Sequence, residues 1–305
     1  MPDIMGTMDI AFPHLGIYLK DVPKIIQIGS FTIAWYGVIL AASMLLGIAL
    51  AAKVGKMTGQ NPDVYWDVSV EMIIFCILGS RTYYVIFFWD SYKDNLIQIF
   101  NLRGGGLAIY GGVIAGVLTL CLYSRRKKLN LYQVLDTAAY GLVLGQIIGR
   151  FANFMNREVF GRYTDSLFAM RIPAVMVRER DIDETIRAHM AAGTNYIQVH
   201  PTFLYESLWN LGLLILLFFL MKRKRFHGEI TLIYFFVYGI GRAWIEAIRT
   251  DQLYIGHTGI PVSLALGLTM AAASFLIWLF CMIRIKKGEF VPFPSTKEPE
   301  ENKNS

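Results

Sequence analysis

Charged residues are scarce in this sequence. Only 17% of its 305 residues are Asp, Glu, Lys or Arg, whereas 55% are hydrophobic. Globular chains carry about 25% of these charged residues, because they need them to cover a solvated surface. The scarcity therefore excludes an ordinary soluble protein and indicates an integral membrane protein.

Cysteine and the usual catalytic motifs are scarce as well. Cys76, Cys121 and Cys281 each lie inside an apolar stretch, where we expect them to pack and to form no disulfide. No Cys-x-x-Cys pair or His/Cys cluster has zinc spacing, and we expect no metal and no cofactor. The sequence also lacks Gly-x-Ser-x-Gly, His-Glu-x-x-His, a Walker loop and the acyltransferase pattern of His and Asp separated by four residues.

Apolar stretches near the roughly 20-residue length of a membrane helix recur along the chain. They predict an all-α polytopic membrane protein with seven transmembrane helices, at about 30–52, 68–89, 105–124, 132–152, 203–221, 229–248 and 260–284. The fourth is the least regular, because Asp136, Gln146 and Arg150 interrupt it.

The segments between and around these stretches complete the predicted domain organisation. Residues 1–27 suit a short amphipathic arm on the outer face, followed by helices one to four over 28–155. Residues 156–200 form a small mixed extracytoplasmic insert, with strand-like pieces at 167–172 and 174–177 and a charged helical piece at 181–192. Helices five to seven occupy 201–285, and 286–305 is a disordered cytoplasmic tail.

Lys and Arg gather on one side of this seven-helix arrangement. Residues 125–128 and 222–225 are four consecutive basic residues each, and the tail from Arg284 holds five more. Cytoplasmic loops of membrane proteins carry such an excess. We therefore expect the N-terminus outside and the C-terminus in the cytoplasm, and we interpret the net charge of +6 as membrane anchoring rather than nucleic-acid binding.

The run GRFANFMNREVFG, residues 149–161, places polar side chains at the end of the fourth apolar stretch. An ionisable group at such a depth is costly unless it meets an anion, a counter-charge or water. Arg150 lies roughly 27–29 Å from an inner helix start at Leu131, near the outer headgroups. A snorkelling interfacial arginine is the alternative, but Asn153, Asn156 and Glu158 beside it favour a binding site.

The sixth apolar stretch repeats this pattern, because Tyr238, Arg242, Glu246 and Arg249 share one helix face. An internal ion pair between Arg242 and Glu246 is the simpler interpretation. It is compatible with function, since a carboxylate can hold a guanidinium group in position for a phosphate. Arg150 and Arg242 come from separate helices at similar depth, and the planar guanidinium binds two phosphate oxygens at once. We therefore predict a phosphate site near the outer leaflet.

Further polar residues stand at the same predicted level. The glycine-rich run 104–116 contains Tyr110 and suits either close helix packing or the approach of a lipid chain. The run HPTFLYE brings His200 and Glu206 to the fifth helix, where a solvated imidazole and a structural partner for an arginine are the alternatives to a site role. Tyr36, taken singly, is better explained by packing.

Taken in order, these motifs resemble those of the bacterial prolipoprotein diacylglyceryl transferases. The most specific is G-R-x-x-N-F-x-N-x-E-x-x-G, matched by Gly149, Arg150, Asn153, Phe154, Asn156, Glu158 and Gly161. Secondary matches are Trp35-Tyr36-Gly37, residues 104–116, His200-Pro201 with Tyr205-Glu206, and Tyr238 with Arg242 and Glu246. The resemblance covers about residues 33–284.

The resemblance implies transfer of the sn-1,2-diacylglyceryl group of phosphatidylglycerol to the lipobox cysteine thiol of a preprolipoprotein, the first step of bacterial lipoprotein maturation. Glycerol phosphate would be released at the outer leaflet of the cytoplasmic membrane, and the bilayer, this lipid and preprolipoproteins would be the partners. The implied catalytic residues are Arg150, Arg242, Tyr110 and Glu246. The implied substrate-binding residues are Arg150, Asn153, Asn156, Glu158, Gly161, Tyr36, Tyr238, Glu206 and His200.

The acceptor of the thiol proton stays open. Some family members carry a histidine where Tyr110 stands, and a phenol is a poor base unless nearby arginines help it. Glu206, Glu246 and a thiolate stabilised directly by arginine are equal alternatives.

Two other classes of membrane protein are less consistent with the sequence. An anion transporter or channel needs polar residues through the inner halves of its helices, yet 117–122, 214–220 and 230–236 are mostly apolar. A membrane-embedded peptidase of the aspartyl type needs a pair of Asp residues in adjacent helices, and no such pair is found.

Overall fold

The computed structural model describes residues 4–102 and 105–289. The chain divides into two compact units, of which the first is Met1–Gly47 with Ala139–Ser305 and the second is Ile48–Ala138. Three predictions fall partly outside the described residues: the first three residues of the N-terminal arm, the start of the glycine-rich run at Gly104 and the disordered tail beyond Glu289.

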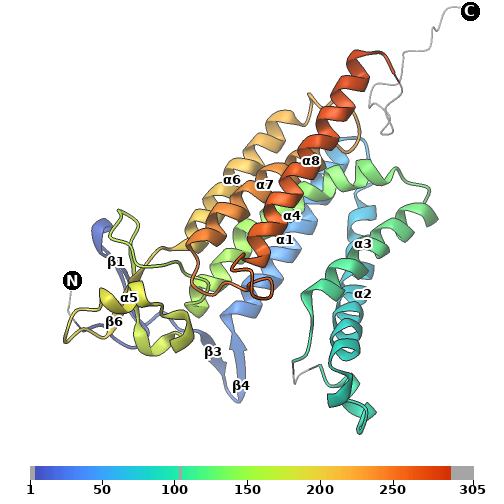
Figure 1. Cartoon of the computed structure of the whole chain (residues 1–305). Helices are drawn as coiled ribbons and strands as arrows, with labels where there is room; N and C mark the ends of the chain where they lie inside the picture. Colours follow the sequence, from blue (N-terminus) through green and yellow to red (C-terminus); the bar gives the residue numbers. More distant parts are fainter. Residues whose placement is uncertain (1–3, 103–104, 290–305) are drawn as a thin grey trace, which may run out of the picture. The chain divides into compact units, whose positions relative to one another are not determined.

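Eight α-helices are present in the described part of the chain (Figure 1). They are α1 (Trp35–Met57), α2 (Asp63–Phe87), α3 (Ile109–Arg126), α4 (Leu131–Asn156), α5 (Glu184–Ala188), α6 (Thr202–Leu220), α7 (Glu229–Ile248) and α8 (Val262–Lys286). Six of them, all but α3 and α5, are long and apolar enough to cross a membrane. The predicted class, a mostly helical multi-pass membrane protein, is confirmed. The 18-residue helix α3 ends in two arginines and is not among the six.

The first long helix begins at Trp35, about five residues later than predicted. Residues before it form a hairpin of β3 (Ile25–Ile28) and β4 (Phe31–Ala34), in which Ile26 faces Ile33. Its β-branched isoleucines favour strands. Gly29 has a φ of 60°, and a glycine at the first position suits a two-residue hairpin turn.

In the second unit, α2 and α3 pack against each other at glycines. A Cβ on Gly79 would lie 2.7 Å from the carbonyl oxygen of Gly111, so only glycine permits this approach. The described part of the glycine-rich run therefore serves helix packing. The connection between the helices is held by buried Arg81, which donates to the carbonyl oxygens of Gln98, Ile99, Asn101, Gly105 and Gly106.

In the first unit, side chains of α6 bond to backbone carbonyls of its neighbours α4 and α7. The Ser207 hydroxyl donates to the carbonyl of Ile147 at 2.9 Å, and the Trp209 indole donates to that of Val237 at 3.0 Å. Such bonds align α6 with α4 and α7 along their lengths. Helix α8 lies alongside α7 (Figure 1).

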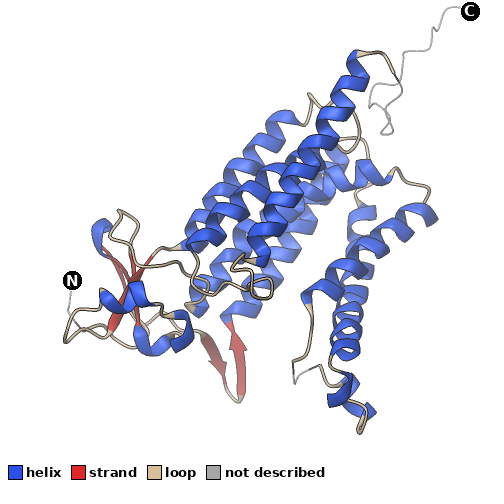
Figure 2. Ribbon diagram, in the orientation of Figure 1, coloured by secondary structure: helices blue, strands red, loops and turns tan. Residues whose placement is uncertain are grey.

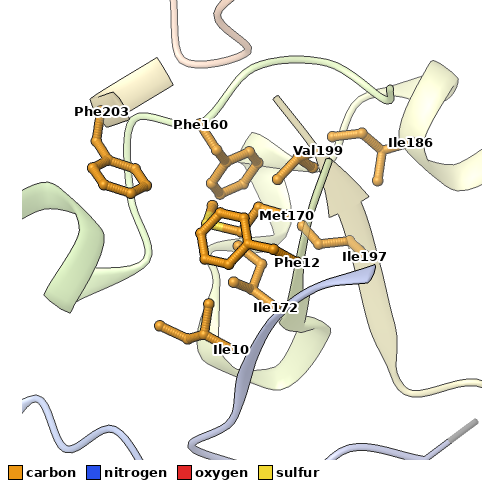
Figure 3. Close-up of a cluster of buried hydrophobic side chains, with 9 residues drawn as sticks. All are labelled: Ile10, Phe12, Phe160, Met170, Ile172, Ile186, Ile197, Val199 and Phe203. Carbon is orange, nitrogen blue, oxygen red and sulfur yellow. The ribbon is translucent and has the colours of Figure 1, made fainter. Parts of the chain in front are cut away.

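Beyond one end of these helices lies a small folded part, which we call the head (residues 4–24 and 157–201). It contains an antiparallel sheet of order β2-β1-β5-β6, formed by β1 (Ile10–Phe12), β2 (Ile17–Leu19), β5 (Met170–Pro173) and β6 (Tyr196–Val199) (Figure 2). Buried apolar side chains from the strands β1, β5 and β6 and from the helices α5 and α6 meet in one cluster (Figure 3). Hydrophobic burial thus joins two distant stretches of sequence.

The head differs from the sequence prediction in four places. Residues 1–27 were expected to form an amphipathic arm, but β1 buries Ile10 and Phe12 against Ile172 and Ile197 of the insert. The piece 174–177, expected to be a strand, is a 3-10 turn at Ala174–Met176 after Pro173, and the helical piece shrinks to α5. Strand β6 was not foreseen, because four residues are too few to show a period.

Helix α4 ends in a Schellman motif that begins the connection to the head. The amide of Glu158 donates to the carbonyl of Asn153, and that of Arg157 donates to Phe154, both at 3.1 Å. Arg157 takes the left-handed position with a φ of 54°, where glycine is usual. Its side chain is 2% exposed and donates to the carbonyls of Met8, Val22 and Met155. The arginine therefore holds the N-terminal strands against the end of α4.

This arrangement predicts a stability effect that separates side chain from backbone. Replacing Arg157 by Gly keeps the left-handed backbone but leaves buried carbonyls unpaired, which costs about 3 kcal/mol. Replacing it by Ala should cost about 1 kcal/mol more, because alanine resists this conformation. Hydrogen exchange of the Val22 amide, which bonds to Met8, measures both effects.

The control is Arg180, another head arginine, whose side chain is 75% exposed. Its replacement by Met should change protection by less than about 0.5 kcal/mol. Equal protection of the Val22 amide in wild type and in the Arg157→Gly variant would contradict the proposed tie.

Candidate functional site

Arginines and carboxylates alternate along a chain of ionic contacts in the first unit. Arg150 Nη2 of α4 lies 2.5 Å from Glu206 Oε1 of α6, and Arg242 Nη1 of α7 lies 3.9 Å from the same oxygen. Arg242 Nη2 is 2.5 Å from Glu246 Oε2, which Arg249 approaches at 3.3 Å. Three helices thereby bring their charged residues together, and Glu206 is shared by the two arginines predicted from the sequence.

This network continues past the end of α7. Arg249 makes a two-bond pair with Asp251, with contacts of 2.9 and 2.8 Å. The network then holds three arginines and three carboxylates, so its formal charges cancel. Cancellation matters here because an unpaired charge inside a membrane protein is strongly disfavoured.

The network keeps some capacity to bind an anion. The carboxylate of Glu206 is only 2% exposed, whereas the side chain of Arg150 is 20% exposed. Arg242 Nη1 has no hydrogen-bond acceptor among the described residues, and its contact with Glu206 is long. A phosphate reaching this end of the bundle would find guanidinium N–H groups of both arginines oriented by carboxylates.

Two tyrosines stand beside Arg150. Tyr238 of α7 is hydrogen bonded to Arg150 and interacts electrostatically with Glu206 and Arg242. Tyr36 in the first turn of α1 interacts with Arg150 and with Glu158. Tyr36, which the sequence alone assigned more readily to packing, therefore lies within electrostatic range of two predicted site residues.

The asparagines and the glutamate after Arg150 form the head side of the site. The Asn153 amide donates to Glu158 Oε1 at 2.9 Å, and Arg178 lies 3.9 Å from the other oxygen. Asn156 and Glu158 also line a cavity of about 230 Å³. Its other walls come from Lys24, Arg157, Met176, Val177, Arg178 and Asp181.

Gly161 lies where two other segments meet the end of the run 149–161, which we call the signature run. Its amide donates to the carbonyl of His200, and the next amide, that of Arg162, donates to Ile248. A Cβ on Gly161 would lie 2.8 Å from His200 Cβ and 2.9 Å from the Ile248 carbonyl oxygen. Only glycine fits, so this position fixes the head to the ends of α6 and α7. Direct contact of Gly161 with substrate stays a prediction.

His200 and Tyr110 are the remaining site residues predicted from the sequence. His200 Nδ1 is 3.1 Å from the Tyr205 hydroxyl, and burial lowers the pKa of His200 below its ordinary value. The imidazole is therefore neutral at pH 7. Tyr110 belongs to the second unit, where it is 50% exposed in the first turn of α3. Its catalytic role stays a prediction.

Some polar groups of the first unit were not identified as site candidates from the sequence. Asp251 extends the ionic chain, although no periodic pattern marks a loop residue. Gln146 donates to the Tyr234 hydroxyl at 2.9 Å, one helical turn below Arg150 and Tyr238. Asn210 of α6 is fully buried, and its amide has no hydrogen-bond partner among the described residues. An amide among the leucines of α6 was the signal that could have identified it.

Comparison with known proteins identifies the family. The family model described as prolipoprotein diacylglyceryl transferase matches residues 23–280. Proteins named phosphatidylglycerol–prolipoprotein diacylglyceryl transferase, from Bacillus mycoides strain KBAB4 and Bacillus cereus strain Q1, are each 38% identical over 277 residues. These alignments cover 89% of this chain and 96% of each relative. The chain therefore belongs to the prolipoprotein diacylglyceryl transferase family.

Proposed function

We propose that this protein transfers the diacylglyceryl group of phosphatidylglycerol to the lipobox cysteine of a prolipoprotein. The observation that carries the proposal is the pair Arg150 and Arg242, which reach one carboxylate from two helices inside a family member. In the reaction the thiol releases its proton to water, a carbon–sulfur bond forms, and the bond between the glyceryl carbon and the phosphate oxygen breaks, with its electron pair remaining on that oxygen. The products are a thioether-linked prolipoprotein and glycerol phosphate.

The arginines act on the leaving group. The phosphodiester carries one negative charge, and the departing phosphate monoester gains most of a second at neutral pH. Guanidinium groups bind the second charge state more tightly, which lowers the barrier. Glu206 and Glu246 each contact two arginines and hold them in place, while Tyr238 and the neighbouring amides orient the phosphate.

The nucleophile belongs to the substrate. A cysteine thiol has an ordinary pKa near 8.5, so a modest electrostatic bias toward thiolate is enough for attack. The carboxylates of Glu206 and Glu246 already serve arginines. We therefore favour a thiolate stabilised by the arginines over a dedicated strong base, with Tyr110 as an orienting hydroxyl.

The active site faces the outer leaflet in this proposal, and seven helices cross the membrane. Strand β1 before α1 pairs with β5 after α4, so both lie on one side of the membrane. An even number of crossings must separate them. Because α1, α2 and α4 are three candidate crossings, α3 is needed as the fourth. The basic loops then lie on the side opposite the head, which the charge rule makes cytoplasmic.

Thiol labelling in intact cells tests this topology. In a variant whose Cys76, Cys121 and Cys281 are replaced by Ala, a cysteine at Ala192 in the head should react with a membrane-impermeant reagent. A cysteine at Lys127 in the α3–α4 loop should react only after permeabilisation. Labelling of both positions in intact cells would refute the arrangement.

Arg150→Lys tests the phosphate clamp. The variant keeps the charge but loses the planar fork, and we expect kcat/KM for phosphatidylglycerol to fall about hundredfold. The assay follows labelled lipid transferred to a lipobox peptide in detergent. The matched control is Arg225→Lys, because Arg225 pairs with Glu229 at the other end of α7 and should tolerate the change. Wild-type activity in the Arg150→Lys variant would rule out a bidentate clamp.

Tyr110→Phe tests whether a hydroxyl is the essential base. We expect this variant to retain activity within about tenfold of wild type, whereas Arg150→Ala should lose at least a hundredfold. The same transfer assay compares the two. Equal abolition by both variants would instead establish an essential hydroxyl at position 110.

A further inference from the structure

The head cavity beside the signature run contains more charge than packing requires. Three cations, Lys24, Arg157 and Arg178, and two carboxylates, Glu158 and Asp181, line its volume of about 230 Å³. Asp181 is 5% exposed, and its only ion pair in the described chain is with exposed Arg180 at 3.6 Å. Arg157 Nε is buried without an acceptor among the described residues. Unpaired buried polar atoms need an explanation, and a polar ligand in the cavity is one.

The cavity adjoins the arginine network at its wall residue Glu158, which accepts a hydrogen bond from Asn153, one helical turn along α4 from Arg150, and two electrostatic interactions relate the same regions. Tyr36 interacts with both Glu158 and Arg150. On the other wall Asp181 interacts with Asp251, whose partner Arg249 belongs to the network. A ligand whose phosphate lies at Arg150 and Arg242 would therefore extend its next group toward the head and into this cavity.

We propose that this cavity binds the terminal glycerol of the phosphatidylglycerol headgroup and thereby selects the lipid. The inference rests on the proposed function and names the residues that recognise the part of the headgroup beyond the phosphate. Glu158 and Asp181 accept hydrogen bonds from the two free hydroxyls, and Asn156 and Lys24 donate to the hydroxyl oxygens.

Size and charge agree with that ligand. A volume of about 230 Å³ corresponds to nearly eight water molecules at about 30 Å³ each, which is enough for a group of six non-hydrogen atoms. The lining carries one more positive than negative charge, so a neutral polyol enters more readily than the ammonium of phosphatidylethanolamine. Lys24 donates to the Met176 carbonyl at 3.0 Å, which keeps its ammonium at the cavity wall.

The test compares phosphatidylglycerol with phosphatidylpropanol, which has the same phosphate and carbon count but no free hydroxyl. Each hydrogen bond from a hydroxyl to a carboxylate contributes about ten- to a hundredfold, so wild type should favour phosphatidylglycerol at least tenfold in kcat/KM. In Asp181→Asn the preference should fall by about fivefold or more, with the rate on phosphatidylpropanol unchanged. A merely structural role would lower both rates equally.

A second variant, Lys24→Met, tests the opposite wall. It should raise the use of phosphatidylethanolamine relative to phosphatidylglycerol by about threefold or more, because a repulsive charge is removed. The control is Asp165→Asn in the same head, whose carboxylate is 66% exposed and does not line the cavity. It should leave every ratio unchanged, and thermal unfolding in detergent confirms that each variant is folded.

The outcomes separate this inference from the proposed function. Absence of any transfer from phosphatidylglycerol by wild type would overturn the proposed function. Transfer without preference over phosphatidylpropanol, or equal losses on both lipids in Asp181→Asn, would overturn the headgroup site alone. In Asp181→Asn, a raised KM for the lipobox peptide with an unchanged preference for phosphatidylglycerol over phosphatidylpropanol would assign the cavity to the peptide. That result would also overturn the headgroup site.

Discussion

The contact between Arg150 and Glu206 is the constraint on which the rest of the site depends. A buried carboxylate and a guanidinium inside a membrane-spanning bundle are stable only together, because either alone would be an uncompensated charge. Once Glu206 is fixed by Arg150, it also orients Arg242, and Arg242 in turn determines where Glu246 and Arg249 lie. The positions of three helices are thus coupled through one carboxylate, and the candidate phosphate site is a consequence of how those charges must pair.

The head depends on a second arginine, which bonds to no carboxylate among the described residues. Arg157 follows the site residues directly in sequence, yet its guanidinium binds backbone carbonyls from the N-terminal strands. The signature run therefore has two functions within a few residues. Its first half presents Arg150 and Asn153 to the bundle, and its second half, through Arg157 and Gly161, fixes the head above them.

Much of this could be predicted where the signal is local. The apolar stretches predicted helices close to their observed bounds, and the four-residue spacing of Tyr238, Arg242 and Glu246 correctly indicated one shared face. The sheet could not be predicted, because β1 and β5 are short and four long helices separate them in the sequence. Asp251 and Asp181 were missed for a related reason: loop residues have no period, and their partners are defined only by the fold.

The pairing of charges also bears on turnover. Without counter-charges, Arg150 and Arg242 would bind the released glycerol phosphate tightly and slow its departure. The carboxylates of Glu206 and Glu246 compete for the same two guanidinium groups, so each arginine has an alternative partner when the product leaves. Stabilisation is then available while charge develops on the leaving oxygen, and it does not become a deep product trap. The carboxylates that stabilise buried arginines in the membrane therefore also allow those arginines to release an anion.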